Sequence, residues 1–297
     1  MLRERKSRGL RRERGENFAA GKKISEGKKD GLKAMNLEKT FRMLRKNWKL
    51  GKYRRLLQNA GLCAATACIV LLLVYFVRGR EAEKEIEALR ALKNQAAAES
   101  SAALPKLDGR EVSGEYQELF LKNPDLVAWL TIDGTKIDYP VMWTPEDPEF
   151  YSHRGFDKKE SQNGLLFLDK GSRINEYGGN LIVYGHNMKN GSMFADLLRY
   201  GKKSYWEGHK SIQLDTLQES RRYEIFAAGK SGDPKALPYG FTTASEKECR
   251  AALEGMQALS LYDTGEKGNW GDDFLTLSTC DYSTKDGRFV VMARRVK

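Results

Sequence analysis

The stretch Phe274-Leu-Thr-Leu-Ser-Thr-Cys280 decides how this chain is interpreted, together with Asp286-Gly-Arg288-Phe-Val-Val shortly after it. An alternating apolar strand ends on a cysteine, a polar loop follows, and a second apolar strand opens with an arginine. A thiol at the end of a rigid strand can act as a nucleophile, and a fixed cation beside it can stabilise the anion that forms. We therefore predict that Cys280 and Arg288 lie together at neighbouring strand ends.

A histidine is delivered in the same way further upstream, in Asn180-Leu-Ile-Val-Tyr-Gly-His186-Asn187. The glycine before His186 gives the backbone freedom to turn where the ring is presented. The chain has 3 histidines in all. His209 lies in a polar loop and is expected to be solvated, while His153 follows a proline-rich loop and is expected either near the cleft or on the surface. We rank His186 first, and a Cys/His/Arg set predicts thiol-based acyl transfer.

Each of these residues also has a simpler interpretation. Cys280 could be a buried structural cysteine, because free cysteine is among the most buried residue types. His186 could be a hydrogen-bonded structural residue, and Arg288 could be solvated. The hydroxyls of Ser278 and Thr279 and the polar loop that begins at Asp281 and Tyr282 favour a strand end that faces a cleft.

The number and spacing of the cysteines exclude a disulfide-stabilised fold and a cysteine-ligated metal site. The 4 cysteines are Cys63, Cys68, Cys249 and Cys280. The first two lie in an apolar segment and are expected to be ordinary residues of its helix, with lipidation as the alternative. Cys249 lies on a polar helix and is predicted to be non-catalytic. This spacing matches neither a disulfide framework nor a metal site, and no cofactor or metal ligand is predicted.

The positive charge of the chain is concentrated at one end. The net charge is +11, and residues 1–55 hold 20 Lys and Arg against 6 Asp and Glu. The remaining residues are close to neutral, so the folded part is not predicted to bind nucleic acid. Residues 1–55 are expected to form a disordered basic arm on the cytoplasmic side, which either lies on anionic lipid or serves as a solvated flank.

An uncharged segment follows the arm. Residues 60–77 contain no charged side chain, and with their flanks they reach the roughly 20 apolar residues that span a bilayer. We predict a single transmembrane helix over residues 56–78, with the N-terminus cytoplasmic because the basic flank precedes it. A cleaved signal peptide does not fit, because the basic region is too long and no small-residue cleavage site follows.

Beyond the membrane segment, residues 79–111 predict a helical stalk and linker, and residues 112–297 a globular domain. The stalk carries an apolar stripe, Ile86, Leu89 and Leu92, that is too short to predict a coiled coil. Short apolar strands alternate with turns, helices are predicted at Gly114–Leu121 and 244–259 and a short one at 193–200, and no regular βαβ repeat is present. This pattern predicts a mainly β fold, an antiparallel barrel or sandwich with peripheral helices.

Residues 112–297 resemble a sortase, and within that family class B. The resemblance rests on Leu181-Ile-Val-Tyr-Gly-His186-Asn, on Thr276-Leu-Ser-Thr-Cys280 and on Gly287-Arg288. Two further segments match class B members. They are Asn123-Pro-Asp-Leu-Val-Ala-Trp129-Leu-Thr-Ile-Asp-Gly-Thr-Lys-Ile-Asp-Tyr-Pro140-Val and Asn163-Gly-Leu-Leu-Phe-Leu-Asp169. The long basic arm is a departure, because typical members have short cytoplasmic tails.

The resemblance implies an eight-stranded closed β-barrel with a groove at one end. It implies a membrane-anchored cysteine transpeptidase of a Gram-positive cell, with His186, Cys280 and Arg288 as catalytic residues and an extracellular catalytic domain. The implied partners are the sorting-signal peptide of secreted proteins, a peptidoglycan or pilin amine, and membrane lipid; no cofactor is implied. Ser278, Thr279 and Tyr282 are expected to contact the peptide.

Two other functions remain open from the residues alone. One is an extracytoplasmic cysteine peptidase that hydrolyses its substrate; papain-like enzymes place Cys before His, and caspase-like enzymes use a parallel sheet with crossover helices, so neither class matches. The other is a tethered binding ectodomain without catalytic activity, which would leave the convergence of the three residues unexplained.

Overall fold

The computed structural model describes residues 37–46, 52–99, 106–107, 109–232, 237–283 and 285–296. The chain divides into two compact units, Met1–Val74 and Tyr75–Lys297. Most of the predicted basic arm, residues 1–55, lies outside the described residues. Within it, residues 37–46 are helical, and the helix α2 (Lys52–Glu99) begins near its end.

The predicted membrane segment lies in α2. Within the described residues this is the one helix that is long and apolar enough to cross a membrane, with a mean hydropathy of 2.5 over its most apolar window. Its large apolar side chains between Leu62 and Val77 are exposed. This composition is compatible with a membrane anchor.

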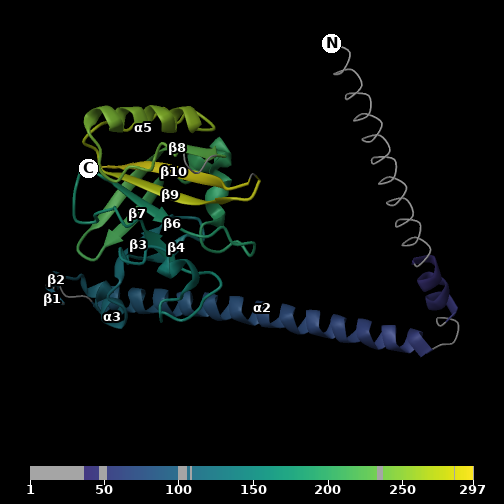
Figure 1. Ribbon diagram of the computed structural model, residues 1–297. Helices are drawn as coiled ribbons and strands as arrows, with labels where there is room; N and C mark the ends of the chain where they lie inside the picture. Colours follow the sequence, from purple (N-terminus) through teal and green to yellow (C-terminus); the bar gives the residue numbers. More distant parts are fainter. Residues whose placement is uncertain are drawn as a thin grey trace, which may run out of the picture. The chain divides into compact units, whose positions relative to one another are not determined.

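The second unit is built around a closed barrel, as predicted (Figure 1). Its strands are β3 (Leu126–Thr131), β4 (Asp138–Met142), β5 (Leu166–Leu168), β6 (Asn180–Tyr184), β7 (Ser211–Thr216), β8 (Ser220–Ser231), β9 (Phe274–Asp281) and β10 (Gly287–Arg295). They follow one another around the barrel in the order β10-β8-β7-β3-β4-β5-β6-β9, which leaves no strand edge open. Most pairs are antiparallel, but β6 runs parallel to β9. A separate small ladder pairs β1 (Lys106–Leu107) with β2 (Arg110–Glu111).

Strand alternation divides the apolar residues into two clusters. On β9, Leu275 and Leu277 belong to the main cluster, whose members fill the barrel. Phe274, one position out of phase, belongs to a second cluster with Cys249 and Met256. These last two side chains come from α5 (Glu246–Leu259), which lies across the outside of the barrel near β8 and β10 (Figure 1). Successive residues of β9 therefore serve opposite faces of the same wall.

The helices agree with the predicted ones in kind and differ in detail. The first helix of the domain is α3 (Gly114–Lys122). The helix α5 begins with a capping box, in which Ser245 and Glu248 satisfy one another's backbone N–H groups. The short helix predicted at 193–200 is the 3-10 turn η2 (Ala195–Gly201). The helix α4 (Lys203–Gly208), which directly follows η2, was not predicted; at 6 residues it is too short for a clear periodicity.

The helical stalk is present, and much of it packs against the barrel. Ile86 and Leu89 on α2 are 7% and 5% exposed and belong to the main apolar cluster. Further along the same face, Arg90 Nε lies 2.9 Å from Asp138 Oδ2 on β4. The apolar stripe that is too short for a coiled coil is therefore a docking face for the domain.

Candidate functional site

Cys280 and Arg288 meet on the outer face of the barrel wall. The antiparallel pairing of β9 and β10 places them directly opposite one another. Arg288 Nη1 donates a hydrogen bond to Cys280 Sγ over 2.9 Å, and both residues are half-buried. The thiol and the guanidinium therefore lie close together, as predicted. The β9–β10 ladder, and not a flexible loop, determines their separation.

His186 reaches the same face through the parallel pairing of β6 with β9. The register places Tyr184 beside Ser278, and each chain then continues by two residues, to His186 and to Cys280. Because side chains alternate across a strand, a step of two keeps both residues on one face. The strand ends are tied together beyond the ladder, since Asn187 Nδ2 donates to the Cys280 carbonyl over 3.1 Å.

The ring of His186 is held by the backbone of a loop. Its Nε2 lies 2.7 Å from the carbonyl oxygen of Ser152. A carbonyl oxygen only accepts hydrogen bonds, so Nε2 carries the proton and donates it. In the neutral ring the lone pair is therefore on Nδ1, and this nitrogen is the one able to take up a proton.

A groove of about 770 Å³ opens over these residues. His186, Cys280 and Arg288 all line it. The rest of its wall comes from the loop and 3-10 turn around η1 (Phe150–His153), the end of β5, the end of β6, the segment before α5, and β9. The further lining residues are Asp147, Pro148, Glu149, Ser152, His153, Phe167, Asp169, Lys170, Tyr184, Gly185, Leu237, Tyr239 and Ser278.

Two tyrosines give the groove neutral hydroxyl groups. Burial, reinforced by the negative charge of Asp169, raises the pKa of Tyr184. Burial also raises the pKa of Tyr239, although its hydrogen bond with Ser278 and the charge of Arg288 oppose the shift. Tyr239 and Ser278 share a hydrogen bond of 2.9 Å beneath the groove. Both tyrosines are thus protonated at neutral pH, and the Tyr184 hydroxyl donates to Asp169 Oδ2 over 3.3 Å.

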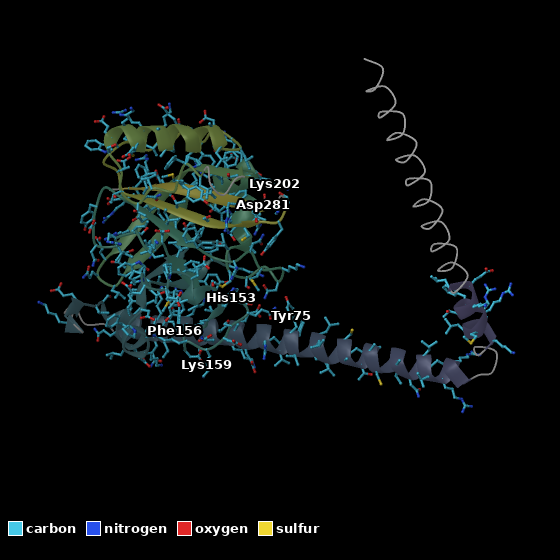
Figure 2. The ribbon with its side chains drawn as sticks, viewed as in Figure 1. Tyr75, His153, Phe156, Lys159, Lys202 and Asp281 are labelled. Atoms are coloured by element: carbon cyan, nitrogen blue, oxygen red, sulfur yellow. The ribbon has the colours of Figure 1, made fainter. Side chains whose placement is uncertain are left out.

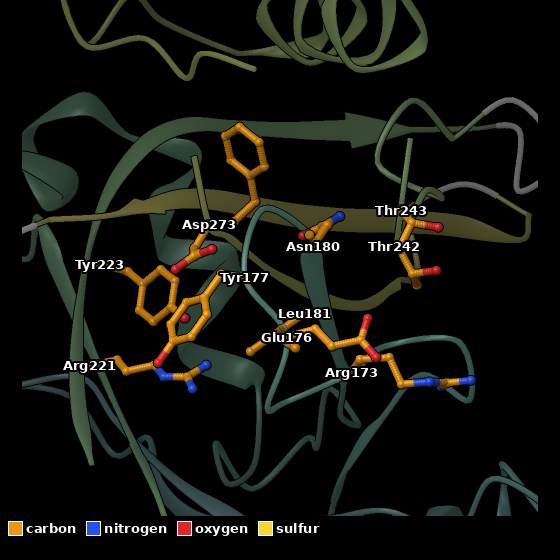
Figure 3. A pocket seen from close by; sticks show the side chains of 12 residues that line it. Arg173, Glu176, Tyr177, Asn180, Leu181, Arg221, Tyr223, Thr242, Thr243 and Asp273 are labelled. Carbon is orange, nitrogen blue, oxygen red and sulfur yellow. The ribbon is translucent and has the colours of Figure 1, made fainter. Parts of the chain in front are cut away.

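A second hollow lies elsewhere on the barrel and has a different character. It holds about 20 Å³ and is lined by Arg173, Tyr177, Arg221 and Asp273 among others (Figure 3). Its Tyr177 ring lies 5.4 Å from the guanidinium carbon of Arg221. It contains no thiol or imidazole, so the chemistry predicted from the sequence belongs to the larger groove. Across the described residues, no group of three or more His, Cys, Asp and Glu side chains is arranged to hold a metal ion.

Comparison with known proteins decides the family. The family model of the sortase domain matches residues 130–296, which is more than half of the chain and includes the whole groove from β4 to β10.

The chain belongs to the sortase family.

Its relatives place it in class B. The sortase B of Listeria monocytogenes is 34% identical over 199 residues, covering 66% of this chain and 79% of the relative. A crystal structure of sortase B from Bacillus anthracis, in complex with AAEK1, is 30% identical and superposes with a TM-score of 0.64, covering 75% of this chain and 99% of that one. The Staphylococcus aureus sortase B–substrate complex shares the fold, with 24% identity, a TM-score of 0.65, and coverage of 74% and 99%.

As a class B sortase, the protein is a cysteine transpeptidase of the kind that anchors proteins to the cell wall. Membership of this family excludes the tethered ectodomain without catalytic activity. It also explains why the three residues converge on one groove.

The three residues expected to contact peptide are placed differently in this sortase. Ser278 lines the groove, although it is 1% exposed and its hydroxyl is hydrogen-bonded to Tyr239. Thr279 is 1% exposed and its Oγ1 donates to the Gly185 carbonyl over 2.7 Å, so its side chain is inside the wall. Tyr282 is 68% exposed and is not among the residues that line the groove. The register explains the difference, because Thr279 is one position out of phase with Cys280 and points to the barrel interior.

The two other histidines lie in different environments, His153 in the groove and His209 outside it. His153, which is labelled in Figure 2, lines the groove. Its ring stacks on that of His186. His209 is half-buried rather than solvated; its ring lies 4.1 Å from that of Tyr205, and Nδ1 is 2.9 Å from the Tyr205 carbonyl. The prediction that His209 is solvated was wrong because it rested on the polar residues around it. The helix α4, whose Tyr205 stacks on His209, was not predicted.

Sequence reasoning missed several groove residues. Tyr184 could have been found, because it lies two positions before His186 and so shares its face. Tyr239 could not, because the chain between β8 and α5 has no periodic pattern. Its place is set by Asn180, whose side-chain amide donates to the Tyr239 carbonyl over 3.0 Å.

Proposed function

We propose that this sortase cleaves the C-terminal sorting signal of secreted proteins and transfers the acyl group to a cell-wall or pilin amine. The observation that carries the proposal is the 2.9 Å contact between Arg288 Nη1 and Cys280 Sγ, beside His186 in one groove. A guanidinium at this distance is in place to stabilise an oxyanion that forms beside the sulfur.

The reaction follows from the roles of the three side chains. The Cys280 thiolate attacks the peptide carbonyl, and Arg288 stabilises the tetrahedral oxyanion. As the C–N bond breaks and the C–S bond of the thioester forms, His186 gives a proton to the leaving amine. The incoming amine then attacks the thioester and loses its proton to His186. A new amide bond forms and the thiolate leaves.

We propose peptide contacts for some residues of the groove and not for others. Ser278, Tyr184 and Tyr239 line the same groove as Cys280. We propose these as contacts for the polar groups of the sorting signal, and we assign Thr279 to the barrel wall instead.

The apolar segment of α2 supports a single-pass anchor. We propose that residues 1–55 are cytoplasmic, that residues 56–78 span the membrane, and that the catalytic domain in residues 112–297 is extracellular. The basic flank on the N-terminal side sets this orientation.

The test uses the full-length chain in detergent with a peptide library that carries a threonine at the cleavage position. Reactions are run with triglycine, with diaminopimelate, and without amine, and the products are identified by mass spectrometry. We expect an acyl adduct on Cys280 and product formation that depends on the amine. Equal cleavage with and without amine would instead support a hydrolytic peptidase, and absence of an adduct on Cys280 would overturn the mechanism.

Cys280→Ala is expected to abolish turnover. Cys249→Ala is the matched control, because this residue of α5 is 3% exposed and packs in the second apolar cluster. Burial raises the pKa of Cys249, with the charge of Asp272 as a second cause, so little of it is thiolate at neutral pH. Equal loss of activity in both variants would contradict the assignment.

A further inference from the structure

Two consecutive residues outside the proposed catalytic set hold the ring of His186. The Ser152 carbonyl accepts the Nε2 proton over 2.7 Å. The ring of His153 stacks on the same imidazole, with centroids 5.5 Å apart and planes inclined by 28°. One residue therefore fixes an edge of the ring and the next covers its face.

We propose that the segment Tyr151–His153 braces His186, and that His153 is a positioning residue of the transfer reaction. The inference rests on the proposed role of His186 in proton transfer. An edge contact alone lets a ring pivot about the hydrogen bond, whereas an edge and a face contact together leave one orientation. The brace therefore keeps one tautomer and one ring direction during both proton transfers.

The brace is itself anchored to the core. Tyr151 is fully buried, and its hydroxyl donates to Asp125 Oδ2 over 2.7 Å and accepts from Asn123 Nδ2 over 2.8 Å. The Leu165 N–H donates to the Tyr151 carbonyl over 2.9 Å. Three contacts from two separate parts of the chain thus fix Tyr151, the residue before Ser152. Because these contacts attach the segment Tyr151–His153 to the core, the segment can hold His186 in one place.

Gly164 explains part of the Asn163–Asp169 segment, which the sequence marked and the catalytic set does not use. Its φ is +56°, and a Cβ there would overlap the Ser152 carbonyl oxygen and lie 2.7 Å from the Tyr151 carbonyl oxygen. Only glycine allows the backbone to approach so closely. Glycine at position 164 therefore leaves room for the Ser152 carbonyl oxygen, which accepts the hydrogen bond from His186.

The first test reads the ring directly and needs no turnover. The chain has 3 histidines, so a sample with ¹⁵N-labelled histidine gives a simple NMR spectrum. We expect the neutral ring of His186 to be protonated on Nε2. His209 is the internal control, because its Nδ1 faces a carbonyl and it should show the opposite tautomer. A mixture of tautomers at His186 in the unmodified protein would overturn the brace.

Gly164→Ala should convert His186 into such a mixture. Gly265→Ala is the matched control, because Gly265 has a φ of +79° but nothing within 4 Å of the place that an alanine methyl group would take. Both substitutions carry the strain of a left-handed backbone, and only the first reaches the Ser152 carbonyl. An unchanged His186 spectrum in a folded Gly164→Ala protein would contradict the proposal; if that variant does not fold, the decision rests on the tautomer in the unmodified protein and on His153.

The second test separates stacking from mere bulk. His153→Ala should lower kcat by about tenfold or more, since small errors in catalytic geometry are costly, and should change KM less. His153→Phe keeps a stacked ring and should recover most of the lost rate. His209→Ala removes a stacked histidine outside the groove and should leave kcat unchanged.

The outcomes of the two tests are independent. A kcat for His153→Ala within about twofold of the unmodified enzyme, or equal losses in His153→Ala and His153→Phe, would overturn the role of His153. A protein that shows the expected tautomers but transfers no peptide would instead contradict the proposed function and leave the brace in place.

Discussion

Cys280 and Arg288 are a directly opposed pair in the ladder between β9 and β10, with Arg288 Nη1 2.9 Å from Cys280 Sγ. Backbone hydrogen bonds on both strands fix this pair. The connection between the two strands can therefore vary in length without moving the cation away from the thiol. The relationship explains why two residues separated by a polar loop act as one unit.

Arg288→Lys should lower kcat by about 100-fold or more. Lysine keeps the charge but loses the planar set of donors that can hold the sulfur and an oxyanion together. Peptide transfer under saturating peptide measures the effect. Arg294→Lys is the control on the same strand, because Arg294 bonds to Glu266 away from the groove. Equal losses in both variants would show that strand stability, and not the donor geometry, is responsible.

Gly185→Ala should destabilise the barrel and disturb His186. A methyl group at this position would overlap Leu166 and lie 2.8 Å from the Phe194 ring. Overpacking of this kind costs about 1–3 kcal/mol, which urea unfolding would detect. Gly201→Ala is the control, since its nearest neighbour, in the Phe289 ring, would be 4.0 Å away. If Gly185→Ala were as stable and as active as Gly201→Ala, the claim that position 185 has no room for a methyl group would be contradicted.

Protonation of Asp281 at low pH should destabilise the end of the β9–β10 hairpin. Burial by itself would raise the pKa of Asp281, but hydrogen bonds from Ser283 and Lys230 outweigh it and hold the pKa below its usual range. A carboxyl with a lowered pKa stabilises the fold above the pKa of its unfolded form, about 3.9, and loses that contribution as the pH falls through the folded value.

The experiment for Asp281 is a series of thermal melts between about pH 7 and pH 3. Asp281→Asn should melt at a lower temperature than the unmodified protein at pH 7, and the two curves should converge toward pH 3. Asp286→Asn removes a charge from the same turn at an exposed position and should show no such convergence. A constant difference for Asp281→Asn across the range would mean that its ionised form is not what stabilises the turn.

Ile86→Ala and Leu89→Ala should each weaken the catalytic unit, although both lie in a helix that leads from the membrane segment. Each side chain is nearly buried against the barrel, and such truncations cost about 2–4 kcal/mol. Urea unfolding of the full-length chain followed by tryptophan fluorescence measures this. Leu121→Ala is the control, since that leucine is 68% exposed. Stabilities that match the control would mean that the stalk does not dock in solution.

The sequence predicted the site more fully than its surroundings. Strand ends are visible as apolar runs that stop at a chemically distinctive residue, so Cys280, His186 and Arg288 could be chosen from the pattern alone. The face of each strand is harder to predict, because alternation gives the period and not the phase. Thr279 was placed in the groove for this reason, although an outward Cys280 requires its neighbour to point inward.

Long-range contacts account for what could not be predicted. Tyr239 is held at the groove by a hydrogen bond from Asn180, which is 59 residues away in sequence, and no pattern in the sequence pairs the two residues. The stripe of Ile86 and Leu89 was visible, but its partner was not, because a short amphipathic face does not reveal what it packs against. The stacking of His153 on His186 depends on a loop whose path is fixed by Tyr151 and Gly164 together.

The alternation along β9 also separates two properties that are often linked in enzymes. Leu275 and Leu277 secure the interior, while Ser278 and Cys280 belong to the outer wall. An exchange at Leu275 or Leu277 therefore alters the packing inside the barrel, whereas an exchange at Ser278 alters the wall of the groove. The outward Phe274 packs with α5, so variation in peptide choice is confined to the groove end of the strand, beside Cys280, whose thiol the reaction requires.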